Sequence, residues 1–361
     1  MKLKWLTFIA PLALTGVACT KKSEPETAAP AAAPAKAAPV EKEATEEEVR
    51  GDNPACFGQA TGGKARDLVI GDLIFQGDGY AMAAAAKDPA NSGNVRVGLI
   101  SDIKESLPGT VANLKTFAAW MIAEKVDMVV VNGDVSYSQK EIEAVLRTLG
   151  AEIKVPTLVI SGNKELARDF DLALTNVSAE HPHIINGNRV RSLSVNDVTF
   201  VTLPGYGRKN YTEPGACLYE QADVDAAAAL LKKAAGQRVL VAHAAPLQEG
   251  DKAVDYMVDG KNVGDERVTK MLGETGTKFA IVGNIKEAGG RGATLAGKPV
   301  AAGEASEELV VNPGPADASP WTMLDNSVSH GMAAIMTIEA NRASYVMKRV
   351  EAPKPAEAPA K

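Results

Sequence analysis

Short hydrophobic runs recur along the chain from residue 95 onward, and each ends in a polar or glycine-containing motif. An apolar run of this length, bounded by such motifs, is typical of a strand that is buried on both faces. Six buried strands are therefore predicted, over residues 95–100, 128–131, 157–160, 239–242, 279–282 and 309–311.

Several of the segments between these strands have helical periodicity. Apolar residues between Val111 and Ile122 recur every three or four positions, and Ser138-x-x-Glu141 is a capping box that predicts a helix closed by Gly150. A third helix is predicted over 222–235, and antiparallel strands over 189–194, 198–203, 333–339 and 343–349. Strands alternating with helices predict a mixed, two-sheet α/β architecture covered by helices.

Residues 51–94 have a less regular pattern. Residues 68–75 are strand-like, residues 77–79 form a Gly-Asp-Gly turn, and residues 80–86 suit either a helix or a strand. We expect this part of the chain to lie at the periphery of the main sheet.

The N-terminus has the pattern of a bacterial export signal. Two lysines precede an apolar run, residues 5–17, that is too short to remain as a membrane span. The small residues before Cys19 resemble the bacterial lipobox, although Gly16 stands where that motif usually has leucine. The resemblance implies a signal peptide over residues 1–19 and a lipid anchor on Cys19. A plain secretory signal cleaved nearby, or a retained helix, is the alternative.

Composition separates a folded domain from two flanking segments. Residues 20–50 and 351–361 are dominated by Ala, Pro, Glu and Lys, which cannot bury enough apolar surface to fold. A domain over 51–350, with its core at 95–350, remains. The net charge of −6 supplies no electrostatic reason to bind nucleic acid.

Cysteine usage is compatible with export. Apart from Cys19, the chain contains Cys56 and Cys217, which could pair as a disulfide outside the cytoplasm. Two buried free thiols are equally compatible with the sequence, because spacing alone does not define disulfide geometry.

The polar motifs at the strand ends follow a recognisable order. They are Asp102-Ile-Lys104, Gly-Asp134, Gly-Asn163-Lys164-Glu165, a lone His243, Gly-Asn284-Ile-Lys286 and Asn312-Pro-Gly314. This order resembles the calcineurin-like metallophosphoesterases, whose pattern runs D-x-H, G-D, G-N-H-E/D, a strand-end His, G-H-x-H and N-P-G. The resemblance spans residues 95–350 and implies a four-layer α/β/β/α fold, a two-sheet sandwich flanked by helices.

In that family, two metal ions activate a bridging water and clamp the phosphoryl oxygens. The resemblance implies that the ligand positions Asp102, Asp134, Asn163 and His243 are retained, whereas Lys104, Asn284 and Lys286 replace histidines. Lys164 stands at the position of the family's catalytic histidine, so no catalytic residue is assigned. An ordinary lysine is a poor proton donor at neutral pH.

The substitutions make metal binding doubtful. The first metal site would use residues 102, 104, 134 and 286, two of which are lysines that carry only donors. The second would use residues 134, 163, 243 and 284 and is a weak mononuclear site at most. We therefore expect no cofactor; an active enzyme would use one or two divalent Mn, Fe or Zn ions. We hypothesise that the ammonium groups of Lys104, Lys164 and Lys286 replace the metals next to Asp102 and Asp134.

Two functions are compatible with these observations. The favoured one is a non-catalytic, envelope-tethered binding or scaffold module, with the membrane, a phosphate-containing ligand or an envelope protein as partner. The alternative is an active phosphoesterase with a reduced metal site. The expected location is the bacterial cell envelope, and the absence of aspartate next to Cys19 favours the outer membrane.

Overall fold

The computed structural model describes residues 56–57, 66–86 and 88–351. The predicted signal peptide, the predicted linker and almost all of the predicted tail lie outside these residues. Within the described ranges, no helix is long and apolar enough to cross a membrane.

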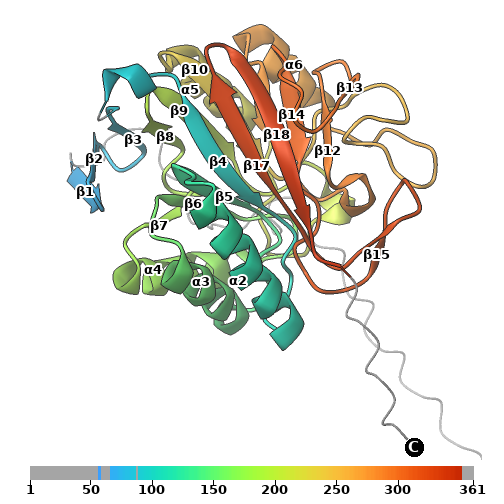
Figure 1. The fold of residues 1–361 in the computed structure, drawn as a ribbon, viewed down its shortest axis with the longest axis horizontal. Coiled ribbons are helices and arrows are strands. Elements are labelled where there is room, and N and C mark those ends of the chain that lie inside the picture. The colour runs from blue at the N-terminus through green and yellow to red at the C-terminus, as the bar shows by residue number, and fades with distance from the viewer. Residues whose placement is uncertain (1–55, 58–65, 87, 352–361) are drawn as a thin grey trace, which may run out of the picture. The chain divides into compact units, whose positions relative to one another are not determined.

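One sheet has six strands in the order β18-β17-β4-β5-β6-β7 (Figure 1). Four neighbouring strands of this sheet are parallel and follow one another in the sequence, and a helix connects each of them to the next. The parallel strands are β4 (Val95–Ile100), β5 (Met128–Asn132), β6 (Thr157–Ile160) and β7 (Ile184–Asn186), joined through α2 (Pro108–Ala123), α3 (Gln139–Glu152) and α4 (Ala167–Glu180). The antiparallel strands β17 (Met332–Glu339) and β18 (Arg342–Arg349) complete the sheet beside β4.

The second sheet has ten strands in the order β1-β2-β3-β8-β9-β10-β11-β14-β12-β13. Its first strands are β1 (Arg66–Ile70), β2 (Leu73–Gly77), β3 (Ala81–Ala84), β8 (Ser192–Val195) and β9 (Val198–Leu203). They are followed by β10 (Gln237–Ala242), β11 (Phe279–Ile281), β14 (Leu309–Asn312), β12 (Arg291–Ala293) and β13 (Pro299–Val300). The remaining elements are α5 (Gln221–Lys233), α6 (Glu266–Thr275), the small pair β15 (Trp321–Thr322) and β16 (Val328–Ser329), and short 3-10 helices at Pro89–Asn91, Lys209–Tyr211 and Lys286–Ala288.

The hydrophobic core divides into layers that follow from strand alternation. One cluster, which includes Leu99, Phe200 and Phe279, fills the space between the two sheets. A second lies between the six-stranded sheet and α2, α3 and α4, and a third between the ten-stranded sheet and α5 and α6. This arrangement confirms the predicted α/β sandwich flanked by helices, because each sheet buries one face on the other sheet and one on helices.

The sequence patterns located most central elements and missed several others. The strand-like stretch at residues 68–75 is a hairpin, in which β1 and β2 reverse at Gly71, a residue with φ of +57°. The following segment forms β3, which joins the periphery of the large sheet. Helices α4 and α6 were not predicted, and α3 runs two residues past Gly150 to Glu152. The N-cap of α4 is Leu166, whose side chain makes no capping hydrogen bond, so the usual sequence signal for a helix start is missing.

The predicted cap of α3 is present. Ser138 Oγ accepts a hydrogen bond from the backbone N–H of Glu141 and donates one to Glu141 Oε2 at 3.0 Å. We expect Ser138→Ala to lower the free energy of unfolding by about 1 kcal/mol in urea denaturation. The matched control is Thr148→Ala in the same helix, whose hydroxyl only bonds the carbonyl of Ala144. An equal loss in both variants would contradict the capping role.

Candidate functional site

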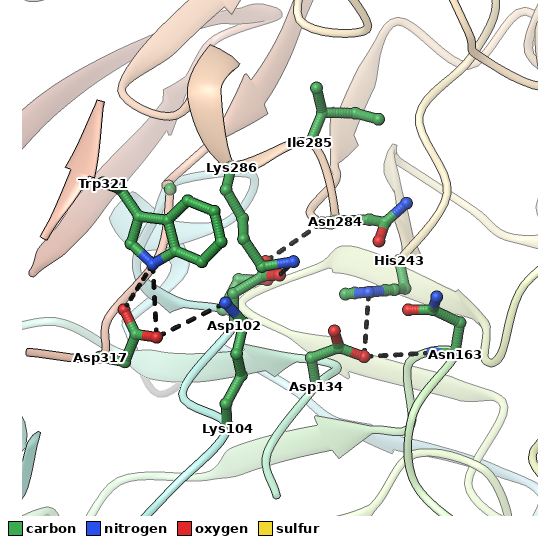
Figure 2. Close-up of polar contacts among 12 residues, drawn as sticks. Asp102, Lys104, Asp134, Asn163, His243, Asn284, Ile285, Lys286, Asp317 and Trp321 are labelled. Atoms are coloured by element: carbon green, nitrogen blue, oxygen red, sulfur yellow. Dashed lines mark hydrogen bonds and ion pairs between the residues drawn. The ribbon is translucent and has the colours of Figure 1, made fainter. Parts of the chain in front are cut away.

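The carboxyl ends of the parallel strands in both sheets bring the polar motifs together (Figure 2). Residues that immediately follow β4, β5, β6, β10 and β11 converge at one end of the sandwich, as expected for polar groups beyond parallel strands. The side chains gathered there include those of Asp102, Asp134, Asn163, His243 and Asn284.

The first part of the site is built around Asp134, which is almost fully buried. Its Oδ1 accepts a hydrogen bond from the backbone N–H of Asn163 at 3.2 Å and lies 3.4 Å from His243 Nε2. The other ring nitrogen, His243 Nδ1, lies 2.8 Å from the carbonyl oxygen of Asn132. Burial alone would lower the pKa of His243, but the negative charge of Asp134 outweighs it and raises the pKa to about 9.

The second part of the site is an ion pair between Asp102 and Lys286. Lys286 Nζ lies 3.2 Å from Asp102 Oδ1, while Asp102 Oδ2 accepts hydrogen bonds from Ser101 Oγ and the backbone N–H of Asn284. Burial opposes ionisation of Asp102, yet the charges of Lys286, His243 and Lys104 prevail and lower its pKa to about 2. The pKa of Lys286 is raised in turn, because Asp102 and Asp134 outweigh the effect of burial. The pair is therefore charged on both sides at neutral pH.

Two residues that the sequence motifs did not identify complete this cluster. Lys104 Nζ lies 3.5 Å from Asp317 Oδ2 and 4.0 Å from the centre of the Trp321 ring, whose indole N–H donates to Asp317 Oδ1 at 3.0 Å (Figure 2). Lys286 also faces this ring. Burial raises the pKa of Asp317 to about 6 despite the nearby Lys104. Asp317 follows the Asn-Pro-Gly motif closely in sequence, but only the fold shows that it faces Lys104.

The hypothesis that Lys164 lies next to Asp102 and Asp134 is wrong. Lys164 Nζ pairs with Glu213 Oε1 at 3.0 Å at the protein surface, so it does not neutralise Asp102 or Asp134. The neighbouring Glu165 is buried, and its carboxyl oxygens accept hydrogen bonds from the backbone N–H groups of Val135 and Gly162. Burial and the charge of Asp134 raise the pKa of Glu165 to about 8. Glu165 thus ties the loop after β5 to the loop after β6.

The backbone of the site is locally strained. Asp102, Lys104, Asp134 and Asn284 have φ between +52° and +64°, the left-handed region that is costly for residues with a Cβ. Gly162 packs so closely that a Cβ there would collide with the carboxylate of Asp134. The loops are therefore held in a defined geometry by contacts within the site.

A disulfide supports one wall of the site. Cys56 and Cys217 are bonded to each other, with Cα atoms 5.3 Å apart, and both are buried. Cys217 belongs to the loop after β9, which also carries Tyr211 and Glu213. In that loop the carbonyl of Tyr211 accepts from Asn163 Nδ2, and the N–H of Glu213 donates to the carbonyl of Asn163. The disulfide thus fixes the segment that positions Asn163. Cys19 lies outside the described residues.

Comparison with known proteins identifies the family and the fold. The family model for calcineurin-like phosphoesterases matches residues 95–276, about half of the chain, so the protein belongs to this family. One similar crystal structure has a TM-score of 0.53 and 16% identity over 71% of this chain and 99% of that chain. A protein from Thermus thermophilus has a TM-score of 0.48 and 14% identity, over 70% and 98% of the two chains. At these identities the likeness is one of fold. No curated protein matches the chain in sequence.

A dimetal phosphatase from Danio rerio is also similar in structure, with a TM-score of 0.44 and 14% identity over 71% of this chain and 95% of that chain. The family uses divalent metals, so the donor set of this chain can be tested for fit. Carboxylate and imidazole atoms of Asp102, Asp134 and His243 lie within 4.8 Å of one another.

The half of the site around Asp102 does not fit a divalent cation. A metal there would need ligands at positions 104 and 286, where the side chains are ammonium groups without a free electron pair. Moreover, Lys286 Nζ already contacts the Asp102 oxygen that a metal would need.

The half around Asp134 fits one cation. Asp134 Oδ2 and Asn163 Oδ1 are buried and have no hydrogen-bond partner among the residues that the structure describes, and the buried His243 Nε2 has only its 3.4 Å contact with Asp134 Oδ1. A carboxylate, an amide oxygen and an imidazole nitrogen are all metal ligands, and unpartnered buried polar atoms are costly.

Proposed function

We propose that this protein is a non-catalytic member of the calcineurin-like phosphoesterase family, tethered to the bacterial envelope through a lipid on Cys19 and acting as a binding or scaffold module. The observation that carries the proposal is the contact between Lys286 Nζ and Asp102 Oδ1 at 3.2 Å. A permanent internal cation neutralises the carboxylate that would otherwise hold the first metal ion.

The chemistry of the family depends on that metal pair. Two ions share the work of lowering the pKa of the attacking water and stabilising charge on the phosphoryl oxygens. Lys286 and Lys104 supply positive charge but offer no coordination position for a water. Both are held by carboxylates, and Lys104 is further covered by the Trp321 ring. The lysines therefore neutralise the carboxylates of the site, as the family's metal ions would, but they cannot bind and activate a water molecule.

Metal content tests this proposal directly. We expect the purified full-length chain to contain fewer than one tightly bound divalent ion after incubation with manganese and removal of excess metal, measured by inductively coupled plasma mass spectrometry. The control is a Lys104→His/Asn284→His/Lys286→His variant, which restores imidazoles at the substituted positions and should gain metal. A stoichiometric pair of ions in the unmodified chain would overturn the proposal.

A second candidate function is a phosphoesterase that works with a single metal ion. The buried atoms Asp134 Oδ2, Asn163 Oδ1 and His243 Nε2 favour it, because they offer one cation three ligands once His243 has released its proton. Hydrolysis of bis(p-nitrophenyl) phosphate that depends on added manganese and disappears in Asp134→Ala would establish this activity and reject the non-catalytic proposal. Unchanged background hydrolysis in both proteins is the result that we expect.

A further inference from the structure

A cavity lies on the outer face of the ten-stranded sheet, separate from the candidate site. Helix α5 packs on β9, and the neighbouring strands β8 and β3 continue the same sheet beyond it (Figure 1). Between these strands and the C-terminal end of α5 is a cavity of about 450 Å³. Small-molecule sites typically have volumes of about 300–1,000 Å³. None of the described residues that line this cavity contributes to the candidate site.

The floor of the cavity carries hydroxyl groups, which follows from strand alternation. The residues of β8 that face the core between the sheets are Leu193 and Val195. Ser192 and Ser194 alternate with them and therefore point to the outer face, into the cavity. Thr199 in β9 pairs with Ser194, and their hydroxyl oxygens are 2.8 Å apart. Where α5 and α6 cover it, the same face of the sheet is apolar. The polar floor is thus specific to the part of the sheet that lies beyond α5.

Two carboxylates stand in the wall of the cavity. Asp78 lies in the turn before β3, where its Oδ1 accepts hydrogen bonds from the backbone N–H groups of Tyr80 and Ala81. Asp197 lies in the turn between β8 and β9, and its Oδ2 accepts a hydrogen bond from Ser92 Oγ at 2.6 Å. These bonds orient each carboxylate through one oxygen. The other oxygen of each has no hydrogen-bond partner in the described part of the chain, so it is available to a ligand.

Tyr80 is the residue that points most directly to a ligand. It lines the cavity, although only 6% of its surface is exposed. Its hydroxyl group has no hydrogen-bond partner among the residues that the structure describes. Burial raises the pKa of Tyr80, so this group is a hydrogen-bond donor at neutral pH. A largely buried phenol normally has a partner for its hydroxyl group. A polar ligand in the cavity would provide one.

We propose that this cavity binds an uncharged sugar. Sugar hydroxyl groups both donate and accept hydrogen bonds, so they match a lining of hydroxyl and carboxylate groups. Apolar lining residues such as Ala83 and Leu230 suit the C–H groups of a sugar ring. Among the described lining residues, the charged ones are Asp78, Asp197 and Lys233. The resulting excess of negative charge disfavours phosphate and other anions.

Saturation-transfer-difference NMR tests this proposal on the purified full-length chain, prepared without glycosidic detergents. The probes are glucose, galactose, mannose and N-acetylglucosamine, each at millimolar concentration. We expect at least one of them to bind with a Kd of about 1 mM or tighter. Inorganic phosphate at the same concentration should not displace the bound sugar, because the cavity carries more negative than positive charge.

Two variants locate the binding in this cavity. Tyr80→Phe removes only the hydroxyl group and should weaken binding about tenfold, the effect of losing one hydrogen bond. Ala83→Trp, at an exposed position of β3, should abolish binding because the indole ring fills the cavity. The matched control is Tyr137→Phe. Tyr137 is 52% exposed and does not line the cavity, so this variant should bind the sugar like the unmodified chain.

Failure of all four sugars to bind would overturn the proposal. Displacement of the sugar by phosphate would do the same, as would an affinity that either Tyr80→Phe or Ala83→Trp leaves unchanged. Because Ala83 is exposed, Ala83→Trp should keep the melting temperature of the unmodified chain. This measurement separates a filled cavity from a loss of the fold.

Discussion

Lys286→Ala is expected to lower the free energy of unfolding by about 3–5 kcal/mol, one of the two largest effects of a single substitution that we predict for this protein. The reason is that Asp102 would remain ionised, buried and without its closest positive partner. Urea denaturation followed by circular dichroism measures this loss at neutral pH.

The pH dependence of the same variant provides an internal check. The pKa of Asp102 is held at about 2, below its ordinary value of 3.8, so the stabilisation from its charge is complete above pH 3.8 and disappears as the pH falls through 2. The difference between Lys286→Ala and the unmodified protein should therefore shrink as the pH is lowered from about 5 to about 2.

Two further variants distinguish an ion-pair effect from general damage. Lys286→Ala/Asp102→Asn should recover part of the loss, because the uncompensated charge is removed together with its partner. Lys164→Ala should change the stability by at most about 1 kcal/mol, since its partner Glu213 is half exposed and the pair is screened by water. If Lys164→Ala were as destabilising as Lys286→Ala, the distinction between the two lysines would be wrong.

Removal of the disulfide is the second large effect. Cys217→Ser should lower the free energy of unfolding by about 2–5 kcal/mol, because the bond joins residues separated by 161 positions and restricts the unfolded chain over that length. Chemical denaturation of the oxidised proteins measures the loss. Asn163 is positioned by the loop that contains Cys217, so hydrogen exchange should also rise in that loop.

Because the bond needs both cysteines, replacing either one or both should have the same effect on stability. Cys56→Ser, Cys217→Ser and the double variant should lose nearly the same stability, and dithiothreitol should produce a comparable loss in the unmodified protein while leaving the double variant unchanged. A double variant as stable as the oxidised protein would show that the bond contributes nothing.

The sequence predicted the central fold because its signals there are local. Strands such as 95–100 and 157–160 are continuous apolar runs, and the structure places β4 and β6 at those bounds. The peripheral hairpin of β1 and β2 and the uncapped helix α4 lack comparable signals, and they were misread or missed. The local sequence pattern was therefore enough to predict those strands that are buried on both faces.

The candidate site shows a similar division. Motif order alone identified Asp102, Asp134, Asn163 and His243 as residues that converge, because each follows a buried strand and parallel strands end at one edge. No motif predicted the directions in which the side chains of Lys164 and Lys286 point. Lys286 turns inward to Asp102, whereas Lys164 turns outward to Glu213, a residue 49 positions away.

By itself, then, the sequence determined the two-sheet architecture, the retained ligand positions of the site and the loss of three metal-binding imidazoles, since these depend on hydrophobic periodicity and on residue type. Only the tertiary structure decided the partners: Lys104 with Asp317 and Trp321, and Cys56 with Cys217. The physical reason is that contacts between residues far apart in the chain are set by how whole layers pack, and such packing leaves no trace in local sequence pattern.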